Sequence, residues 1–349
     1  MQLVECVPNF SEGRDRAVID EIAAGINSAA GVDLLDVSAG ADANRTVFTF
    51  VGSPDAVFDG AFRGIAKAAA RIDMTKHHGA HARLGACDVC PFVPLQDISM
   101  DECVDLARRL GRRVADELSI PVYLYENAAS NPERCNLATL RAGEYEGLRK
   151  KLTDPRWQPD FGEARFNAKS GATAIGARDL LIAINFDLDT RDCALAHDVA
   201  CQIRESGCLM KDDGGTIVRD DRCQPLRQLG TFKFVKAIGW YMECFEHAQV
   251  SVNLTNYRAT PLSAVFDEVC RLAEERGARC IGSELIGLIP RESLLEAGRH
   301  FRHKTGKTAP VAEPELIRSA VSGLLLDALH PFSPDKKIIE YCIQCVREV

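Results

Sequence analysis

The segment RTVFTFVGSPDAVFDGAFRGIAKAAAR (Arg45–Arg71) decides how the first half of this 349-residue chain folds. Its opening residues, Arg45–Gly52, are rich in β-branched and aromatic side chains and predict a strand. Ser53 and Pro54 then form a typical helix start. Apolar residues recur at helical spacing as far as about Arg71, at Val57, Phe58, Phe62 and Ile65. A strand followed at once by an amphipathic helix predicts a mixed α/β unit.

Before and after this segment, the same types of element recur in a fixed order. In the first half we expect strands at Leu3–Pro8, Asp33–Val37, Arg45–Gly52 and Val89–Leu95, with helices at Asp15–Ala29 and Ser53–Arg71. In the second half we expect strands at Leu180–Phe186, Thr231–Glu243, Ala248–Thr255 and Arg279–Ile281, with helices at Thr190–Ser206 and Thr260–Arg276. Both halves read β-α-β-β-α-β. The predicted fold class is therefore α/β (α+β), with two ferredoxin-like split βαβ subdomains.

The boundary between the two halves falls near Ala177–Leu180, which gives subdomains at 1–179 and 180–349. A polar stretch with several glycines, at about 207–230, predicts a surface insertion in the second subdomain. Each subdomain carries helices on one face of its sheet, so the other face needs a cover. We expect the two sheets to face each other, or to meet edge to edge, with a ligand cleft between them.

The composition excludes several classes of protein. Hydrophobic residues make up 46% and charged residues 26%, as in a folded globular protein. The net charge of −8 argues against nucleic-acid binding. No run of about 18 apolar residues predicts a membrane helix, and the N-terminal segment lacks the features of a signal peptide. The 14 cysteines are then expected to be reduced thiols of a cytoplasmic protein.

The densest polar cluster is KHHGAHARLG (Lys76–Gly85), which is predicted to form a loop between a helix and a strand. Histidine can both accept and donate a proton near neutral pH, so His77, His78 and His81 are candidates for acid–base work. Gly79 and Gly85 would let the backbone approach a ligand. A solvated surface loop and a metal site are alternative interpretations.

Two further stretches have both a chemical and a structural interpretation. Cys87–Cys90 and Cys342–Cys345 each match C-x-x-C, but their unrelated positions favour buried free thiols over a zinc site. The segment GEARFNAKSG (Gly162–Gly171), together with the following Arg178, combines small residues with cations that suit a carboxylate ligand. The same composition is also typical of a flexible linker. GATAIGA (Gly171–Ala177) does not match a dinucleotide-binding fingerprint.

Several long motifs resemble the formiminotransferase family. LVECVPNFSEG (Leu3–Gly13), KHHGAHARLGACDVCPFVP (Lys76–Pro94) and RAGEYEGL (Arg141–Leu148) resemble its N-terminal subdomain. AQVSVNLTNY (Ala248–Tyr257) and GSELIGLIP (Gly282–Pro290) resemble its C-terminal subdomain. The motifs occur in order over nearly the whole chain. The resemblance is to glutamate formimidoyltransferase in its stand-alone form, without the cyclodeaminase domain that is fused to some members.

The resemblance implies a fold with a ligand tunnel between two facing sheets. It also implies a transferase that moves a formimino group from N-formimino-L-glutamate to N5 of tetrahydrofolate, giving 5-formimidoyltetrahydrofolate and L-glutamate. This reaction belongs to histidine degradation and one-carbon metabolism. Tetrahydrofolate would be a co-substrate, no metal is expected, and a cytoplasmic homodimer is implied. Two alternatives are a glutamate formyltransferase that uses 5-formyltetrahydrofolate, and a folate-binding paralogue with impaired catalysis.

The resemblance also assigns site residues. The last histidine of the loop motif, His81, corresponds to the catalytic acid/base. The folate-contacting segment corresponds to Gly162, Glu163, Ala164, Arg165, Phe166, Asn167, Ala168, Lys169, Ser170 and Gly171. For the two carboxylates of glutamate we select Arg45 and Arg178. Ser38 stands where the family commonly has an acidic residue, and Asp36 and Asp42 are the acidic residues near it in sequence.

Overall fold

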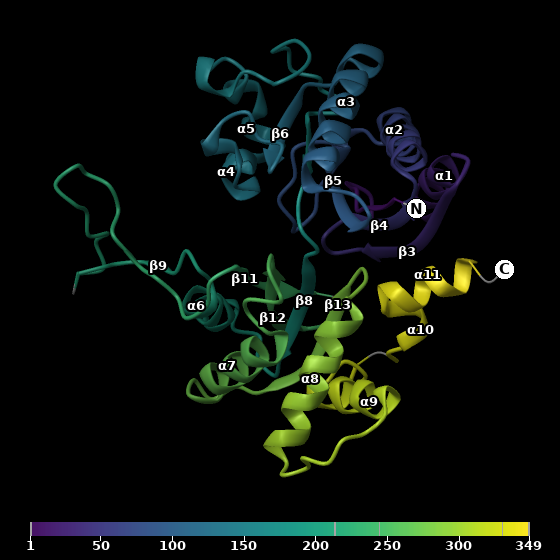
Figure 1. Cartoon of the computed structure of the whole chain (residues 1–349). Helices are drawn as coiled ribbons and strands as arrows, with labels where there is room; N and C mark the ends of the chain where they lie inside the picture. The colour runs from purple at the N-terminus through teal and green to yellow at the C-terminus, as the bar shows by residue number, and fades with distance from the viewer. Residues whose placement is uncertain (1, 213, 244, 330, 348–349) are drawn as a thin grey trace. The chain divides into compact units, whose positions relative to one another are not determined.

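The computed structural model describes residues 2–212, 214–243, 245–329 and 331–347 (Figure 1). Asp213 of the insertion lies outside the described residues. The chain divides into two compact units, 1–179 together with 343–349, and 180–342. No helix of the described part has the length and apolar character needed to cross a membrane.

Unit 1 is built on a sheet with the predicted β-α-β-β-α-β order. Its elements are β1 (Leu3–Cys6), β2 (Asn9–Phe10), α1 (Arg16–Asn27), β3 (Val32–Gly40), β4 (Arg45–Gly52), α2 (Pro54–Arg71) and β5 (Cys87–Gln96). β1 and β2 form one interrupted strand between β4 and β5, and β3 pairs with the outer edge of β4. All these pairs are antiparallel, which is the ferredoxin-like arrangement and confirms the prediction.

The helices of unit 1 begin where local chemistry predicts. The Asp15 side chain accepts hydrogen bonds from the first free N–H groups of α1, and Ser53 caps α2 with Pro54 in its first turn. Both helices bury an apolar stripe against the sheet, where Phe10, Phe48 and Phe50 are fully buried.

Two further strands, with the helices that connect them, extend the sheet beyond β5. They are η1 (Met74–Lys76), α3 (Met100–Leu118), β6 (Val122–Glu126), η2 (Pro132–Arg134), α4 (Leu137–Arg141), α5 (Glu144–Lys151), η3 (Pro155–Trp157) and β7 (Thr173–Ala177). β7 lies between β5 and β6 and is parallel to both. In the stretch from Gly162 to Arg178, the linker interpretation therefore fails at Thr173–Ala177, because all five residues of β7 are buried in the sheet.

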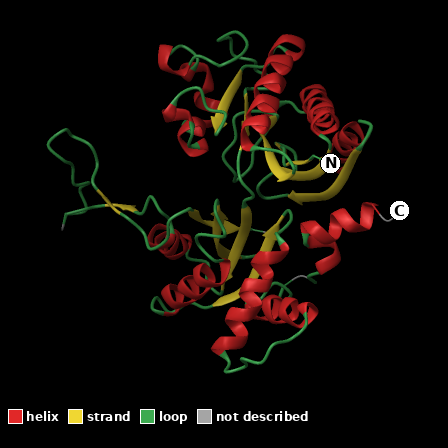
Figure 2. Cartoon of the chain, viewed as in Figure 1, coloured by secondary structure: helices red, strands yellow, loops and turns green. Residues whose placement is uncertain are grey.

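Unit 2 repeats the order in a four-stranded antiparallel sheet, as predicted (Figure 2). Its elements are β8 (Ile182–Leu188), α6 (Cys193–Ile203), β11 (Val235–Met242), β12 (His247–Leu254), α7 (Leu262–Glu274) and β13 (Cys280–Ile286). The strand order is β11-β12-β8-β13. α8 (Arg291–Lys304), α9 (Glu313–Gly323), α10 (Pro334–Lys337) and α11 (Ile339–Arg347) follow. Gly282–Glu284 lies within β13, which is longer than predicted.

The insertion of unit 2 is an exposed arm that leaves the chain after α6 (Figure 1). β9 (Cys208–Leu209) and β10 (Arg227–Gln228) form a two-stranded antiparallel ribbon at its base. Its side chains beyond the base are almost all exposed, which confirms the predicted surface position.

Candidate active site

The histidine loop, residues 72–86, is anchored by its first histidine. The Arg83 Nε donates to His77 Nδ1 at 3.2 Å, so the other ring nitrogen carries the proton. That nitrogen, Nε2, lies 2.8 Å from the Asn44 carbonyl oxygen. Burial lowers the pKa of His77. We therefore assign His77 a supporting role, because both of its nitrogens are occupied.

The tip of the loop is fastened to the β3–β4 hairpin. Asn44 Nδ2 donates to the His78 carbonyl at 2.9 Å, and the Ala80 amide donates to the Asp42 carbonyl at 3.0 Å. A Cβ atom on Gly79 would lie 2.2 Å from the Ala43 carbonyl oxygen, so only glycine fits this close approach. The hairpin thus sets the direction in which the next residues leave the loop.

His81 is half-buried, and its hydrogen bonding defines its tautomer. Nδ1 lies 2.7 Å from the Ala82 carbonyl oxygen, which can only accept, so Nδ1 carries the proton and Nε2 holds the lone pair. Burial and the nearby charges of Arg45 and Arg141 lower the pKa of His81 to about 3, against a smaller opposite effect of Asp88. His81 is therefore a neutral base near pH 7.

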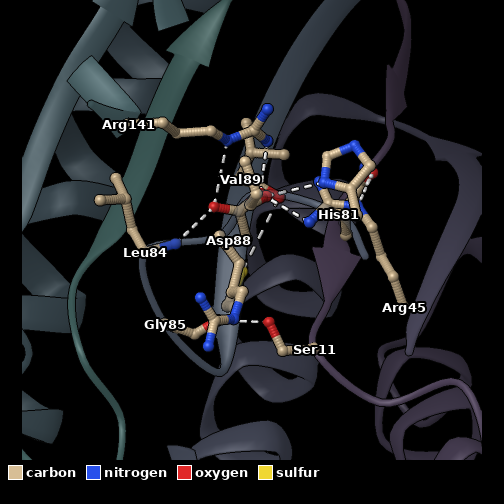
Figure 3. A network of polar contacts seen from close by, with 12 residues as sticks. Ser11, Arg45, His81, Leu84, Gly85, Asp88, Val89 and Arg141 are labelled. Carbon is tan, nitrogen blue, oxygen red and sulfur yellow. Dashed lines mark hydrogen bonds and ion pairs between the residues drawn. The ribbon is translucent and has the colours of Figure 1, made fainter. Parts of the chain in front are cut away.

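Asp88, the second residue of β5, holds the charges around His81 in place (Figure 3). Its buried carboxylate accepts from Arg45 Nη1 at 2.6 Å, from the Leu84 amide at 2.9 Å and from Arg141 Nε at 3.2 Å. Arg141 Nη2 also donates to it. Burial alone would raise the pKa of Asp88, but Arg141 and Arg45 hold that pKa below its usual range. Asp88 is an anion that fixes two cations beside the histidine.

Sequence reasoning did not single out Asp88 or Arg141. The available signal was one carboxylate inside an otherwise apolar strand, CDVCPFVP (Cys87–Pro94). The family resemblance indicates position 38 on β3 instead, where the Ser38 hydroxyl donates to Asp36 Oδ2 at 2.6 Å. The charge of Asp88 acts on His81 and raises its pKa, against the larger opposite effect of burial and the two arginines.

The structure brings one end of the predicted folate segment to the histidine loop. Gly85 forms an antiparallel bridge with Gly171, and the Ala86 amide donates to the Ser170 carbonyl at 2.9 Å. The backbone of Gly171 has a φ of 68°, in the left-handed region that favours glycine. Residues 170–171 and 85–86 therefore form one rigid junction.

The rest of the 162–171 segment runs along the surface of unit 1. Gly162, Glu163, Ala164 and Arg165 are exposed. The Phe166 ring packs against Tyr145, with centroids 5.4 Å apart, and under the guanidinium of Arg149. The Lys169 ammonium donates to the Ala70 carbonyl at 2.8 Å. The segment is thus held in place from Phe166 to Gly171 and has an exposed stretch at residues 162–165.

The two arginines selected for substrate carboxylates have different surroundings. Arg45 is 7% exposed, and besides Asp88 it donates from Nε to Asn9 Oδ1 at 3.1 Å. Arg178 follows β7 and is half-buried, with Nη1 donating to the Asp179 carbonyl at 2.9 Å. Arg45 therefore contributes charge from within the protein, while Arg178 keeps donors that a ligand could use.

Comparison with known proteins assigns both units. A model of the formiminotransferase domain, N-terminal subdomain, matches residues 3–178, and a model of the formiminotransferase domain matches residues 183–344. The chain belongs to the formiminotransferase family. It is 42% identical to a glutamate formimidoyltransferase of Streptococcus pyogenes, over 86% of this chain and 93% of that protein. It is equally identical to a glutamate formimidoyltransferase of Thermoplasma acidophilum, over 88% of this chain and 94% of that protein.

Larger members of the formiminotransferase family match as well. A formimidoyltransferase-cyclodeaminase of Gallus gallus is 47% identical over 99% of this chain. The present chain spans 61% of the length of that relative.

A shallow polar hollow of about 480 Å³ lies beside the histidine loop of this formiminotransferase chain. It is lined by His78, Gly79, Arg83, Gly143, Glu144 and Glu146. Arg83 spans it through ion pairs of 2.9 Å to Glu144 and 2.6 Å to Glu146. These two ion pairs fix the histidine loop to α5 across the hollow.

The C-x-x-C motifs of the chain do not form a common site. Cys87 and Cys90 are buried in β5, where Cys90 Sγ lies 3.5 Å from Cys6 Sγ, and Cys342 and Cys345 lie in α11. Within the described ranges, His, Cys, Asp and Glu side chains form no group of three suited to a metal ion.

Proposed function

We propose that this protein transfers the formimino group of N-formimino-L-glutamate to N5 of tetrahydrofolate, with His81 as the group that moves the proton. Its relatives of similar length are named glutamate formimidoyltransferase. The observation that carries the chemical role is the tautomer of His81. With Nδ1 bound to the Ala82 carbonyl, Nε2 carries the lone pair, and this is the atom that we assign to take the proton.

The reaction requires the transfer of one proton from N5 of tetrahydrofolate to the nitrogen of glutamate. N5 of tetrahydrofolate attacks the formimino carbon, and a C–N bond forms to give a tetrahedral intermediate. His81 Nε2 takes the proton from N5 and then gives it to the nitrogen of glutamate. The bond between that nitrogen and the formimino carbon breaks, and L-glutamate leaves. Proton transfer of this kind accounts for about 10²- to 10⁴-fold of the rate.

The low pKa of His81 suits the second half of this sequence. The same burial and the same cations that lower the pKa make protonated His81 a strong acid. It therefore returns its proton readily to the leaving nitrogen. Asp88 keeps Arg45 and Arg141 in position for this effect. We assign both arginines and Asp88 as positioning residues of the reaction.

We place the folate at the 162–171 segment, because its inner end is fixed to the histidine loop and its outer end is exposed. Arg165 and Arg178 supply cations for carboxylates. By family resemblance we also propose a homodimer in the cytoplasm. Light scattering on the purified protein tests whether it is a dimer.

The test of the proposed function is a transfer assay. The purified protein is mixed with N-formimino-L-glutamate and tetrahydrofolate, and the mixture is then acidified. Acid converts 5-formimidoyltetrahydrofolate to methenyltetrahydrofolate, which absorbs near-ultraviolet light. We expect a signal that grows with time and with enzyme. Absence of product at high enzyme concentration, with folate bound, would indicate a folate-binding protein instead.

A further inference from the structure

The sheet of unit 2 has one apolar and one polar face. Ile184 and Phe186 of β8 are buried in the apolar core with residues of α6 and α7. Strand residues alternate between faces, so Asn185 and Asp187 point to the opposite side. The strand register places Gln249 of β12 beside Asp187, and Glu284 of β13 beside Asn185. With His247, these residues form what we call the Asp187 cluster.

Hydrogen bonds lock the side chains of the Asp187 cluster. Asp187 Oδ1 lies 2.7 Å from His247 Nε2 and accepts from Gln249 Nε2 at 2.6 Å. The Trp240 indole N–H donates to Gln249 Oε1 at 2.9 Å, which fixes the orientation of that amide. Asn185 Nδ2 donates to Glu284 Oε2 at 3.0 Å. The cluster is thus preorganised, with its rotamers set by its neighbours.

One atom of the cluster has no partner among the residues that the structure describes. Asp187 is 1% exposed, yet its Oδ2 is buried without a hydrogen bond from any of them. A buried carboxylate oxygen in this state is destabilising unless a donor reaches it. A Cβ on Gly282 would lie 3.2 Å from this oxygen and 2.6 Å from Leu329 Cγ, so the Leu329 side chain fills the space beside the glycine. The half-exposed Leu329 side chain covers the same glycine, so a ligand could enter by displacing it.

The cluster holds two carboxylates but has no lysine or arginine partner among the described residues. Asp187 and Glu284 both accept from the single nitrogen Gln249 Nε2, at 2.6 Å and 3.5 Å, so the two carboxylates lie close together. Within the described ranges, neither forms an ion pair with lysine or arginine, and His247 is the one basic group in contact with Asp187. Buried charges are normally paired, so the buried Asp187 beside the half-buried Glu284 favours a bound cation.

We propose that the Asp187 cluster binds a small planar amidinium cation, a group whose N–H donors lie on both sides of one carbon. Such a cation matches carboxylate oxygens in charge and in geometry. A metal ion fits less well, because the amides of Asn185 and Gln249 turn N–H groups toward the carboxylates. If the proposed function holds, on which this identification rests, the formimino donor is the molecule that carries this group.

Formamidinium chloride is the direct probe, and its binding to the whole chain can be followed by calorimetry with sodium chloride as the salt control. We expect Asp187→Asn and Glu284→Gln each to weaken binding about tenfold or more. Asp189→Asn is the matched control, because Asp189 pairs with Arg279 outside the cluster. Equal affinity in wild type and both cluster variants would overturn the proposal, as would the absence of binding to the wild type.

Steady-state kinetics supply the second measurement. The two cluster variants should raise KM for N-formimino-L-glutamate about tenfold and leave KM for tetrahydrofolate within about twofold. A rise in KM for tetrahydrofolate alone would overturn the assignment to the formimino donor. Because formamidinium binding requires no turnover, it separates failure of this site from failure of the proposed transferase activity. Thermal unfolding of each variant shows whether it has folded.

Discussion

Gly85 and Gly171 form an antiparallel bridge in which a side chain on either residue would collide with the other strand. A Cβ on Gly85 would lie 2.2 Å from the Ser170 carbonyl oxygen, and one on Gly171 would lie 2.2 Å from the Leu84 carbonyl oxygen. The bridge joins the loop that carries His81 to the segment in which we place the folate. A change at either glycine should therefore affect both parts.

Gly171→Ala should lower the free energy of unfolding by about 1–3 kcal/mol, because it combines a positive φ with a collision against backbone. It should also lower kcat, since the strain moves the histidine loop. Gly147→Ala is the control: this glycine lies in helix α5 with nothing within 4 Å of the added atom. That variant should be as stable as the wild type or more so. Urea unfolding compares the two.

His81→Ala should lower kcat about 10²- to 10⁴-fold through loss of proton transfer. Tetrahydrofolate should still bind, with a Kd within about threefold of the wild type by calorimetry. His78→Ala is the matched control, because His78 is in the same loop with its side chain exposed. Near-normal turnover in His81→Ala would remove the assignment of His81 as the proton carrier.

Arg141→Met should raise the pKa of His81, because it removes one of the cations that lower this pKa to about 3. The neutral base is the active form, so the acidic limb of kcat/KM should move to higher pH. NMR titration of the His81 ring measures the pKa directly. Arg149→Met, in which the lost guanidinium lies over Phe166, should leave it unchanged. An unchanged pKa in Arg141→Met would show that Arg141 does not act on His81.

Asp88→Asn should cost about 3–5 kcal/mol of stability, since it leaves the buried Arg45 without its counter-charge. Asp154→Asn removes a surface ion pair with Arg156, which water screens, and should cost far less stability. Chemical denaturation measures both effects. A loss for Asp88→Asn no larger than that for Asp154→Asn would contradict the central place of Asp88.

Stability should depend on pH through His77 and His81. Both have a folded-state pKa below the ordinary value of 6.5, so the unfolded chain binds protons more readily. Their contribution is fully present above pH 6.5 and is lost as pH falls through the range below it. The urea midpoint should drop less between pH 7 and pH 5 in His81→Gln than in the wild type. An equal drop would indicate that His81 titrates normally.

The sequence could predict the β-α-β-β-α-β order because each element carries a local signal, such as the Ser53–Pro54 helix start or the β-branched residues of β4. β7 lacks such a signal. Thr173–Ala177 is rich in alanine and glycine, and it becomes a strand only through pairing with β5 and β6. Local propensity is a weak guide where tertiary pairing decides.

The candidate site likewise combines residues that the sequence could predict with residues that only tertiary contacts bring together. His81 was predicted from its motif, and the structure adds the tautomer and the charges that define it. The link between Asp88 and Arg141 joins residues 53 positions apart and could not be predicted from spacing. The Asp187 cluster likewise gathers residues from several strands, each of which is an unremarkable polar residue in the sequence.

The arm of unit 2 is closed at its base, where Arg227 donates to the Ser206 carbonyl at 2.6 Å and to the Gly207 carbonyl at 3.1 Å. Its two ends therefore lie side by side, and closing a longer or shorter loop there changes the entropy only slowly with length. Homologues can gain or lose residues at this point during evolution without shifting α6 or β11. The same property makes the arm a natural place to graft an affinity tag or a fluorescent label.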